Sequence, residues 1–444
     1  MKRFRLPLIA LAASALIASC AGGPDGVDPG EVDPDGEIEP REISWLLSRP
    51  ADGATIAIFE ALAEEYAEEH PGFSLELITT PDRPSYIQKY ETLAAAGKLP
   101  ELFDTDATPF AQKLADQGQM MDVEALLQDM GLYDDYRENA LDYQRFDDGS
   151  LHMIPFEFQL EFFWYNQALF DQAGVQVPAS LDDFPQLCAD LRAAGVTPIA
   201  LNGTDQWPLE RYIAYHPFRT AGPGYIQDLK RGEASLGDQA GRQAVEWIES
   251  LAEAECFDRG FSSTGYADAQ ALFTSGSAAM YNVGTWELAS LATENLDAAV
   301  RDDVDFFTLP TVEGAVTAPN EYVVSSGIGM AVNADTYDPL VRDFLEFALA
   351  EYPGRYAATG ALSPTTGVAT AVPEDATERY RQAVAAADDL GEQLVMPWDT
   401  QLDPTANARL QQELVLLAQG NITADEFIAT VDSTIQESAP KYFD

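Results

Sequence analysis

Apolar positions at the start of the body of the chain switch between the period of a strand and that of a helix. A short apolar run at 43–47 predicts a strand, and the stretch after it carries apolar residues three and four apart, as an amphipathic helix does. Residues 73–77 alternate apolar with polar side chains, which is typical of a second strand. A helix at 86–96 and a short buried strand at 102–103 follow. Strand, helix and strand in succession predict an α/β fold.

Helical periodicity continues through the rest of the chain. Ser180 and Asp183 have the spacing of a capping box at the start of one predicted helix. Thr423 and Glu426 have the same spacing before another. Residues 303–309 are apolar on both faces, which predicts a central strand. The amphipathic helices lie at 180–194, 239–256, 338–350, 405–419 and 424–436.

The length of the chain predicts more than one hydrophobic core. It has 444 residues, of which 46% are apolar, so it exceeds the usual size of a single domain. We expect two lobes, each a mostly parallel sheet flanked by helices. Ligands of such sheets bind beyond the carboxyl ends of the strands, which makes Asp104 and Asp106, at the end of strand 102–103, candidate ligand contacts.

The formal net charge of -49 excludes several partners. An acidic surface repels phosphate backbones and anionic lipid head groups, so we expect neither nucleic-acid binding nor membrane attachment through a basic face. Solubility in a salty or crowded medium accounts for the acidity without a specific partner.

The first twenty residues have the pattern of an export signal. Basic residues at 2, 3 and 5 precede the apolar run 6–17, which is shorter than the roughly 20 apolar residues that span a bilayer. Residues 17–20, Ile-Ala-Ser-Cys, resemble a bacterial lipobox. We therefore expect residues 1–19 to be a cleaved signal peptide and Cys20 to be lipidated. The alternative is an ordinary secretory signal with a chance cysteine.

Residues 20–40 predict a tether between this anchor and the body. They are acidic and rich in Pro and Gly, so they repel one another and cannot pack. Glu31, Asp33 and Asp35 fall on the spacing of an EF-hand loop. That loop prefers Asp at its first position and follows a helix, whereas here Glu stands first and prolines interrupt, which argues against calcium.

Two further cysteines leave the disulfide question open. In an exported protein Cys188 and Cys256 suggest a bond that would stabilise the fold by about 4 kcal/mol through loop closure. Two separately buried thiols are the alternative. The histidines, at 70, 152 and 216, are scattered and form no zinc pattern, so no metal is expected.

The sequence has no strong catalytic signature, but its tryptophans fall in unusual places. Phosphate-binding loops, zinc-protease helices and hydrolase elbows are missing from it. Trp207, Trp286 and Trp398 each lie among turn-forming and polar residues. Indoles can fill gaps structurally, but three in such loops suit stacking on the apolar faces of sugar rings.

Blocks spread over residues 43–444 resemble extracellular solute-binding protein family 1, the carbohydrate-binding lipoproteins of ABC importers that include the maltose-binding proteins. The order and spacing of the blocks carry the resemblance. They are His152-Met153-Ile154-Pro155, Phe162-Phe163-Trp164-Tyr165-Asn166, residues 169–175, 271–280 with Gly284 and Trp286, Leu309-Pro310, and residues 325–329.

The resemblance implies a periplasmic-binding-protein-like fold with a ligand cleft between two lobes. It implies crossovers near 150–157, 305–312 and 353–362. The N-terminal lobe would hold residues 41–152 and 308–356, and the C-terminal lobe residues 153–307 and 357–444.

The resemblance also implies ligand-binding residues. Trp286 matches the stacking residue of a Gly-x-Trp motif, and Trp207 resembles an aromatic contact on the facing lobe. Gln159 lies where the maltose-binding proteins hold an acidic sugar contact, so the hydroxyl-binding pattern departs from theirs. The further candidates are Asp104, Asp106, Trp398, Glu157, Tyr322, Asp52 and Arg49.

The function implied is capture of a sugar, with an oligosaccharide favoured, by closure of the lobes and its delivery to the permease subunits of an ABC importer. The protein would be a monomer outside the cytoplasm, held to the cell membrane through lipid alone, without cofactor or catalysis. Two alternatives stay open: a lipid-anchored glycoside hydrolase or esterase, and a binding protein for a peptide, polyamine or metal.

Overall fold

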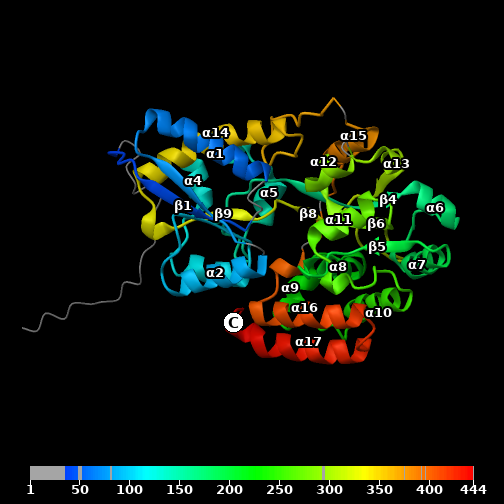
Figure 1. Cartoon of the computed structure of the whole chain (residues 1–444). Helices are drawn as coiled ribbons and strands as arrows, with labels where there is room; N and C mark the ends of the chain where they lie inside the picture. The colour runs from blue at the N-terminus through cyan, green and yellow to red at the C-terminus, as the bar shows by residue number, and fades with distance from the viewer. Residues whose placement is uncertain are drawn as a thin grey trace, which may run out of the picture.

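A computed structural model describes residues 36–48, 53–80, 83–292, 296–374, 376–391, 393–395 and 397–443. The predicted signal peptide, Cys20 and most of the tether lie outside these residues, as do Arg49 and Asp52. Figure 1 shows two lobes side by side, each with strands covered by helices. Within the described residues, no helix combines the length and apolar character needed to cross a bilayer.

The N-terminal lobe is built on a four-stranded sheet in the order β2-β1-β3-β9. Its strands are β1 (Glu42–Leu46), β2 (Ser74–Ile78), β3 (Leu102–Thr105) and β9 (Gly329–Val332). Strand β1 runs parallel to β2 and β3, as the βαβ pattern predicts, and β9 is antiparallel to β3. Its helices are α1 (Ala54–Glu69), α2 (Arg83–Ala95), α3 (Pro109–Asp116), α4 (Val123–Asp129), α5 (Glu138–Tyr143) and α14 (Pro339–Ala358).

Aromatic side chains fill the centre of this lobe. The Trp45 ring lies 4.8 Å from that of Phe59, edge to face, and 5.7 Å from that of Phe156. All three side chains are buried. Because they come from β1, α1 and the chain after α5, they hold the first sheet, its covering helix and the approach to the second lobe together.

The C-terminal lobe has a mixed sheet in the order β5-β6-β4-β7, with β8 paired to β4. Its strands are β4 (Gln159–Asn166), β5 (Thr197–Ala200), β6 (Ala278–Gly284), β7 (Val304–Phe307) and β8 (Val324–Ser325). Strand β4 is antiparallel to β6, β7 and β8, and only β5 and β6 are parallel. The prediction of a mostly parallel sheet is therefore wrong for this lobe.

The segment predicted as a central strand, 303–309, is at the end of this sheet. Its strand β7 pairs only with β4 along the sheet order. Its two aromatic residues still find apolar neighbours, because Phe306 stacks on Phe162 at 4.4 Å and Phe307 on Phe163 at 5.2 Å. An apolar run on both faces therefore reflects packing against neighbouring rings here, and not a central position.

Helices surround the C-terminal sheet, and their starts follow the sequence signals. Both capping boxes are present, Ser180 with Asp183 and Thr423 with Glu426. The helices are α6 (Gln167–Ala173), α7 (Phe184–Ala193), α8 (Trp207–Ala221), α9 (Gly224–Lys230), α10 (Gln239–Glu253), α11 (Tyr266–Thr274), α12 (Leu288–Leu291), α13 (Ala298–Arg301), α15 (Glu378–Ala385), α16 (Pro404–Ala418) and α17 (Ala424–Ser438).

The chain passes between the lobes near 157, 326–328 and 357–361. Phe156 packs in the N-terminal core and Phe158 in the C-terminal one. Ser325 pairs with β4, whereas Gly329 pairs with β3. The second passage thus comes later than the predicted 305–312, and the N-terminal lobe does not begin again at residue 308. The apolar residues after β7, Leu309 among them, are buried in the C-terminal core, which keeps the chain there.

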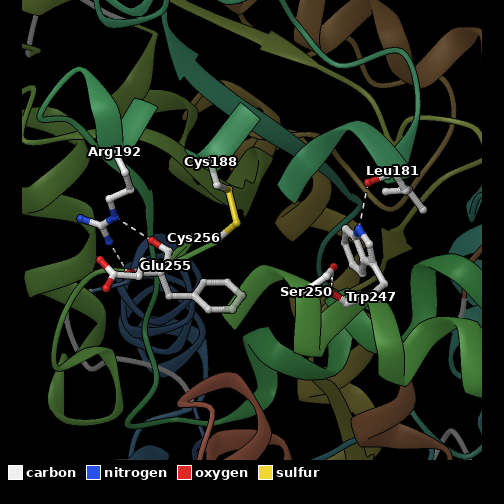
Figure 2. The surroundings of a disulfide bond; sticks show 8 residues. Leu181, Cys188, Arg192, Trp247, Ser250, Glu255 and Cys256 are labelled. Atoms are coloured by element: carbon white, nitrogen blue, oxygen red, sulfur yellow. Dashed lines mark hydrogen bonds between the residues drawn. A yellow bond between two sulfur atoms is a disulfide. The ribbon is translucent and has the colours of Figure 1, made fainter. Parts of the chain in front are cut away.

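Cys188 and Cys256 form a disulfide, which decides between the two alternatives left open by the sequence (Figure 2). It joins α7 to the chain just after α10, with Cα atoms 5.1 Å apart. Arg192, one turn later on α7, donates to the carbonyls of Glu255 and Phe257 at 2.7 and 2.6 Å. The carbonyl of Cys256 in turn accepts from Ile199 of β5 at 3.0 Å, so the bond fastens a helix and the edge of the sheet.

Candidate functional site

Two half-buried indoles from distant parts of the sequence meet in the C-terminal lobe. Trp207 opens α8, and Trp286 lies in the 3₁₀ turn η5 (Thr285–Glu287) that follows β6. Their ring centroids are 6.3 Å apart and the rings are inclined by 64°, an edge-to-face contact. The structure therefore brings together the two tryptophans that were predicted to stack on the ligand, but the prediction that Trp207 lies on the lobe facing Trp286 is wrong, because α8 and β6 belong to the same lobe.

The Trp286 ring is seated on a glycine. A Cβ atom at Gly284 would lie 2.0 Å from the indole, so a side chain at this position would displace the ring. The indole Nε1 donates to the hydroxyl of Tyr266 on α11 at 2.6 Å. The glycine of the Gly-x-Trp motif is therefore required by sterics: its missing side chain leaves room for the indole at the end of β6.

Trp207 is held by the loop before α8. Gln206 has a φ of 68°, a left-handed conformation that is rare for residues with a side chain. Asn202 donates to the Asp205 carboxylate at 2.7 Å within the same loop. On the other side, the Arg211 guanidinium lies 4.9 Å from the Trp207 ring. The loop and this cation fix the ring against α8.

Arg211 connects the indoles to buried acids. Its side chain is only 8% exposed and contacts Glu161 of β4 at 3.1 Å and also Asp399. Burial raises the pKa of Glu161, and the charge of Arg211 opposes that rise. The pKa of Arg211 is raised because Asp399 and Glu161 outweigh its burial.

A second ion pair faces this group from the N-terminal lobe. Arg83, at the start of α2, pairs with Asp106 after β3. Burial disfavours the Arg83 cation, but Asp106 and Asp399 outweigh burial and raise its pKa. Asp399 belongs to the C-terminal lobe, in the 3₁₀ turn Trp398–Thr400. Charged groups of the two lobes are therefore electrostatic neighbours here, and Arg211, which pairs with Asp399, also contacts the Trp207 ring.

Gln159 lies where the chain passes between the lobes. Its side-chain oxygen accepts from the Thr285 hydroxyl at 2.7 Å, next to Trp286. Its amide donates to Glu157 at 3.0 Å and to the Tyr356 hydroxyl of α14 at 3.3 Å. The amide that replaces the family's acid is thus occupied by bonds within the protein, and these link the indole turn to the N-terminal lobe.

Other predicted contacts are also engaged within the protein. Asp104 is buried and accepts from the Trp45 indole at 3.0 Å and from the Ser48 amide at 2.8 Å. Asp106 forms an ion pair with Arg83, which also interacts electrostatically with Asp399. The structure therefore separates two acids that look alike in the sequence: Asp104 joins strands β1 and β3, and Asp106 pairs with Arg83 of α2.

The remaining predicted residues are buried or lie against loops. Trp398 is 2% exposed and stacks on Tyr225 at 6.2 Å. Tyr322 is equally buried, 5.8 Å from the Phe162 ring. Glu157 packs over Gly327, where a Cβ would lie 2.8 Å from its carboxylate. The structure does not bring Trp398 or Tyr322 to the indole pair.

Several residues of the site were missed by the sequence analysis. They are Arg83, Arg211, Asp399, Tyr266 and Glu287. Arg211 had a local signal, since it follows Trp207 by four residues at the start of a helix and so lies on the same face. The others had none that separates them from the many charged and polar residues of the chain.

A further contact joins the lobes away from these indoles. The carboxylate of Asp147, in the loop after α5, forms an ion pair with Lys230 of α9 and lies 3.3 Å from the Arg231 guanidinium. Lys113 of α3 donates to the Lys441 carbonyl at 3.1 Å and lies 4.2 Å from the Tyr442 ring. In Figure 1 the red C-terminal segment accordingly ends next to the N-terminal lobe, beneath α2.

Among the residues that the structure describes, no group of three or more His, Cys, Asp or Glu side chains could hold a metal ion. The site consists instead of aromatic faces, charged pairs and hydrogen-bonding groups. Such a combination can hold a polar, ring-shaped molecule by stacking and by hydrogen bonds.

A family model described as bacterial extracellular solute-binding protein matches residues 52–351. The chain is 22% identical over 374 residues to an uncharacterized ABC transporter extracellular-binding protein of Pyrococcus horikoshii, covering 76% of this chain and 82% of that one. It is 22% identical over 191 residues to the multiple sugar-binding protein of Streptococcus mutans, covering 42% of this chain and 44% of that one.

Solved structures show the same two-lobe fold. A chitin oligosaccharide binding protein superposes with a TM-score of 0.79 at 22% identity, over 90% of this chain and 99% of that one. RafE in complex with raffinose gives a TM-score of 0.67 at 17% identity, over 90% and 99% of the two chains.

Proposed function

This chain belongs to the bacterial extracellular solute-binding protein family, and from that premise we propose that it captures a sugar between its lobes and delivers it to an ABC importer. The match of the family model over residues 52–351 confirms the predicted resemblance to this family. The edge-to-face pair of Trp207 and Trp286 carries the proposal of a sugar, because indole faces stack on the apolar faces of pyranose rings. Relatives whose names state a sugar ligand support it.

The proposed ligand is an uncharged oligosaccharide. Arg83 and Arg211 each already face carboxylates, so an anionic ligand would have to displace Asp106 or Asp399. Hydroxyl groups, in contrast, can both donate to the acids and accept from the arginines without changing the net charge. The specific contacts would be made by Trp207, Trp286 and Asp106, with Glu157 and Gln159 at the edge of the site.

The location and partners complete the proposal. A lipid on Cys20 would anchor the protein on the outer side of the membrane, and residues 21–40 would form a tether between this anchor and the folded body. The protein would be a monomer, and its closed form would dock on the permease. The sugar would leave unchanged, as binding proteins release their ligands. Incubation of the purified protein with oligosaccharides, followed by chromatography, tests this, and any turnover would favour a glycosidase instead.

We expect Trp286→Ala to weaken sugar affinity at least tenfold and to leave thermal stability nearly unchanged. The ring is half-buried and packs against the outside of the C-terminal core, so its loss removes a stacking face while the fully buried core side chains stay in place. Isothermal calorimetry with raffinose, maltose and a chitin oligosaccharide measures the affinity. Trp247→Phe, a change in the core, is the control and should bind as the wild type does. Unchanged binding with a large loss of stability would make Trp286 a core residue.

We expect Asp147→Asn to favour an open arrangement of the lobes and to weaken affinity about threefold to tenfold. The change leaves the Lys230 ammonium, 3% exposed, with the Gln401 side chain at 3.2 Å and no carboxylate. Small-angle scattering should report a larger radius of gyration. Asp148→Asn is the matched control, since that neighbouring carboxylate bonds only Ser150 within its own loop. Equal radii for both variants would contradict the expectation.

A further inference from the structure

A chain of hydrogen bonds runs from the Trp286 indole to a buried carboxylate. The indole Nε1 donates to the Tyr266 hydroxyl at 2.6 Å. That hydroxyl donates its own proton to one oxygen of Glu287, and the Gln270 amide donates to the other. Each group in the chain therefore has its partner, and the sequence of donors fixes the direction of every bond.

The members of this chain come from two elements, α11 and η5. Tyr266 and Gln270 are four residues apart on α11, so both point from the same face of that helix. Glu287 follows Trp286 directly in η5. The indole is thus bonded at its nitrogen by Tyr266 of α11, and it also contacts the Trp207 ring and lies against Gly284.

We propose that Tyr266 and Glu287 are positioning residues that hold the Trp286 indole in the orientation that receives the sugar. The inference rests on the proposed function, because it takes Trp286 as a ligand contact. A tryptophan side chain that is held in one orientation before binding loses less freedom when the ligand arrives, and this increases affinity.

The Glu287 carboxylate is an unusual choice if its only task is packing. It is 8% exposed, and a buried carboxylate costs more than an apolar side chain of similar size. Burial raises the pKa of Glu287, and hydrogen bonds from Tyr266, Ser290 and Gln270 oppose the rise. Tyr281 also faces Tyr266 and Glu287, and its hydroxyl is in hydrogen-bonding contact with that of Tyr266. As the acceptor of its proton, Glu287 orders the Tyr266 hydroxyl so that its oxygen faces the indole nitrogen.

Tyr266→Phe tests the proposal because it keeps the ring and removes only the hydroxyl. We expect the dissociation constant for the best-bound sugar among raffinose, maltose and a chitin oligosaccharide to rise about threefold to tenfold. Tyr66→Phe is the matched control. Its hydroxyl also donates to a carboxylate, that of Asp343 at 2.6 Å, but in the N-terminal lobe. Thermal unfolding of both variants records any general loss of stability.

A readout without ligand separates this proposal from the proposed function. In protein with ¹⁵N-labelled indoles, Trp286→Phe identifies the Trp286 resonance, and Tyr266→Phe should shift that resonance. Glu287→Gln keeps an acceptor for the tyrosine and should bind within about twofold of the wild type, whereas Glu287→Ala should bind as weakly as Tyr266→Phe.

Each outcome decides the matter. A shifted resonance with weaker binding and unchanged unfolding supports the proposal. An unmoved resonance overturns the hydrogen-bond chain, and a shifted resonance with unchanged affinity overturns its role in binding. If the wild type binds none of the sugars and the resonance still shifts, the proposed function fails while the hydrogen-bond chain stands, and its role toward a sugar is overturned with that function.

Discussion

Arg211→Met is expected to lower the free energy of unfolding by about 3–5 kcal/mol. The reason is the position of the Glu161 carboxylate, which is 1% exposed and has the Arg211 guanidinium at 3.1 Å. Removal of the cation leaves a buried negative charge without compensation, and such a charge costs more than the pair itself contributes. Urea unfolding followed by circular dichroism measures the change.

The loss of stability in Arg211→Met should depend on pH in a defined direction. Burial already raises the pKa of Glu161, and the loss of Arg211 raises it further above the unfolded value of about 4.3. A carboxyl whose pKa is higher in the folded protein than in the unfolded chain lowers the stability as the pH rises above its pKa in the unfolded chain. The difference in the free energy of unfolding between variant and wild type should therefore be larger at about pH 8 than at about pH 5.

Two further variants control this experiment. Arg211→Met combined with Glu161→Gln removes the uncompensated charge and should recover part of the stability at about pH 8. Arg355→Met breaks a surface pair with Glu65 at 2.7 Å and should cost less than about 1 kcal/mol. If Arg211→Met alone were as stable as Arg355→Met, the buried ion pair would contribute no more to the free energy of unfolding than the surface pair does.

Loss of the Cys188–Cys256 disulfide is expected to lower the free energy of unfolding by about 4 kcal/mol. The bond closes a loop between residues 68 apart, and it holds α7 to the chain after α10. Without it the unfolded chain gains freedom that the folded chain does not. Urea unfolding with and without a thiol reductant measures the effect.

The double variant Cys188→Ala with Cys256→Ala serves as the control for the disulfide. It should unfold at the urea concentration of the reduced wild type and should not respond to the reductant. Equal unfolding midpoints for oxidised and fully reduced wild type would contradict the expected stabilisation.

Local sequence signals predicted the opening βαβ unit and the capped helices of this fold, but not the arrangement of the strands in the C-terminal lobe. The capping boxes at Ser180 and Thr423 are present because each needs only residues three apart. Segment 303–309 was assigned to the wrong place in its sheet because its apolar faces pack on Phe162 and Phe163, which are far away in the sequence. Strand direction in the C-terminal lobe likewise depends on how β4 meets three other strands.

The candidate site shows the same division. Trp207 and Trp286 were found because an indole in a polar loop is unusual, whereas Trp398 gave the same signal and is stacked on Tyr225 in the core. Asp104 and Asp106 look alike in the sequence, yet one bonds the Trp45 indole and the other pairs with Arg83.

The sequence by itself determined the opening βαβ unit, the helices that begin with capping boxes and the need for more than one core, whereas Trp207, predicted in a loop, is the first residue of α8. The features that it determined depend on periodicity, composition and neighbours a few residues apart. Only the tertiary structure decided which charges are paired, which cysteines are joined and which indoles meet. Hydrogen bonds and ion pairs act over a few ångströms, and the residues that make them here, such as Glu161, Arg211 and Asp399, are brought within that distance only when the packed elements are in place.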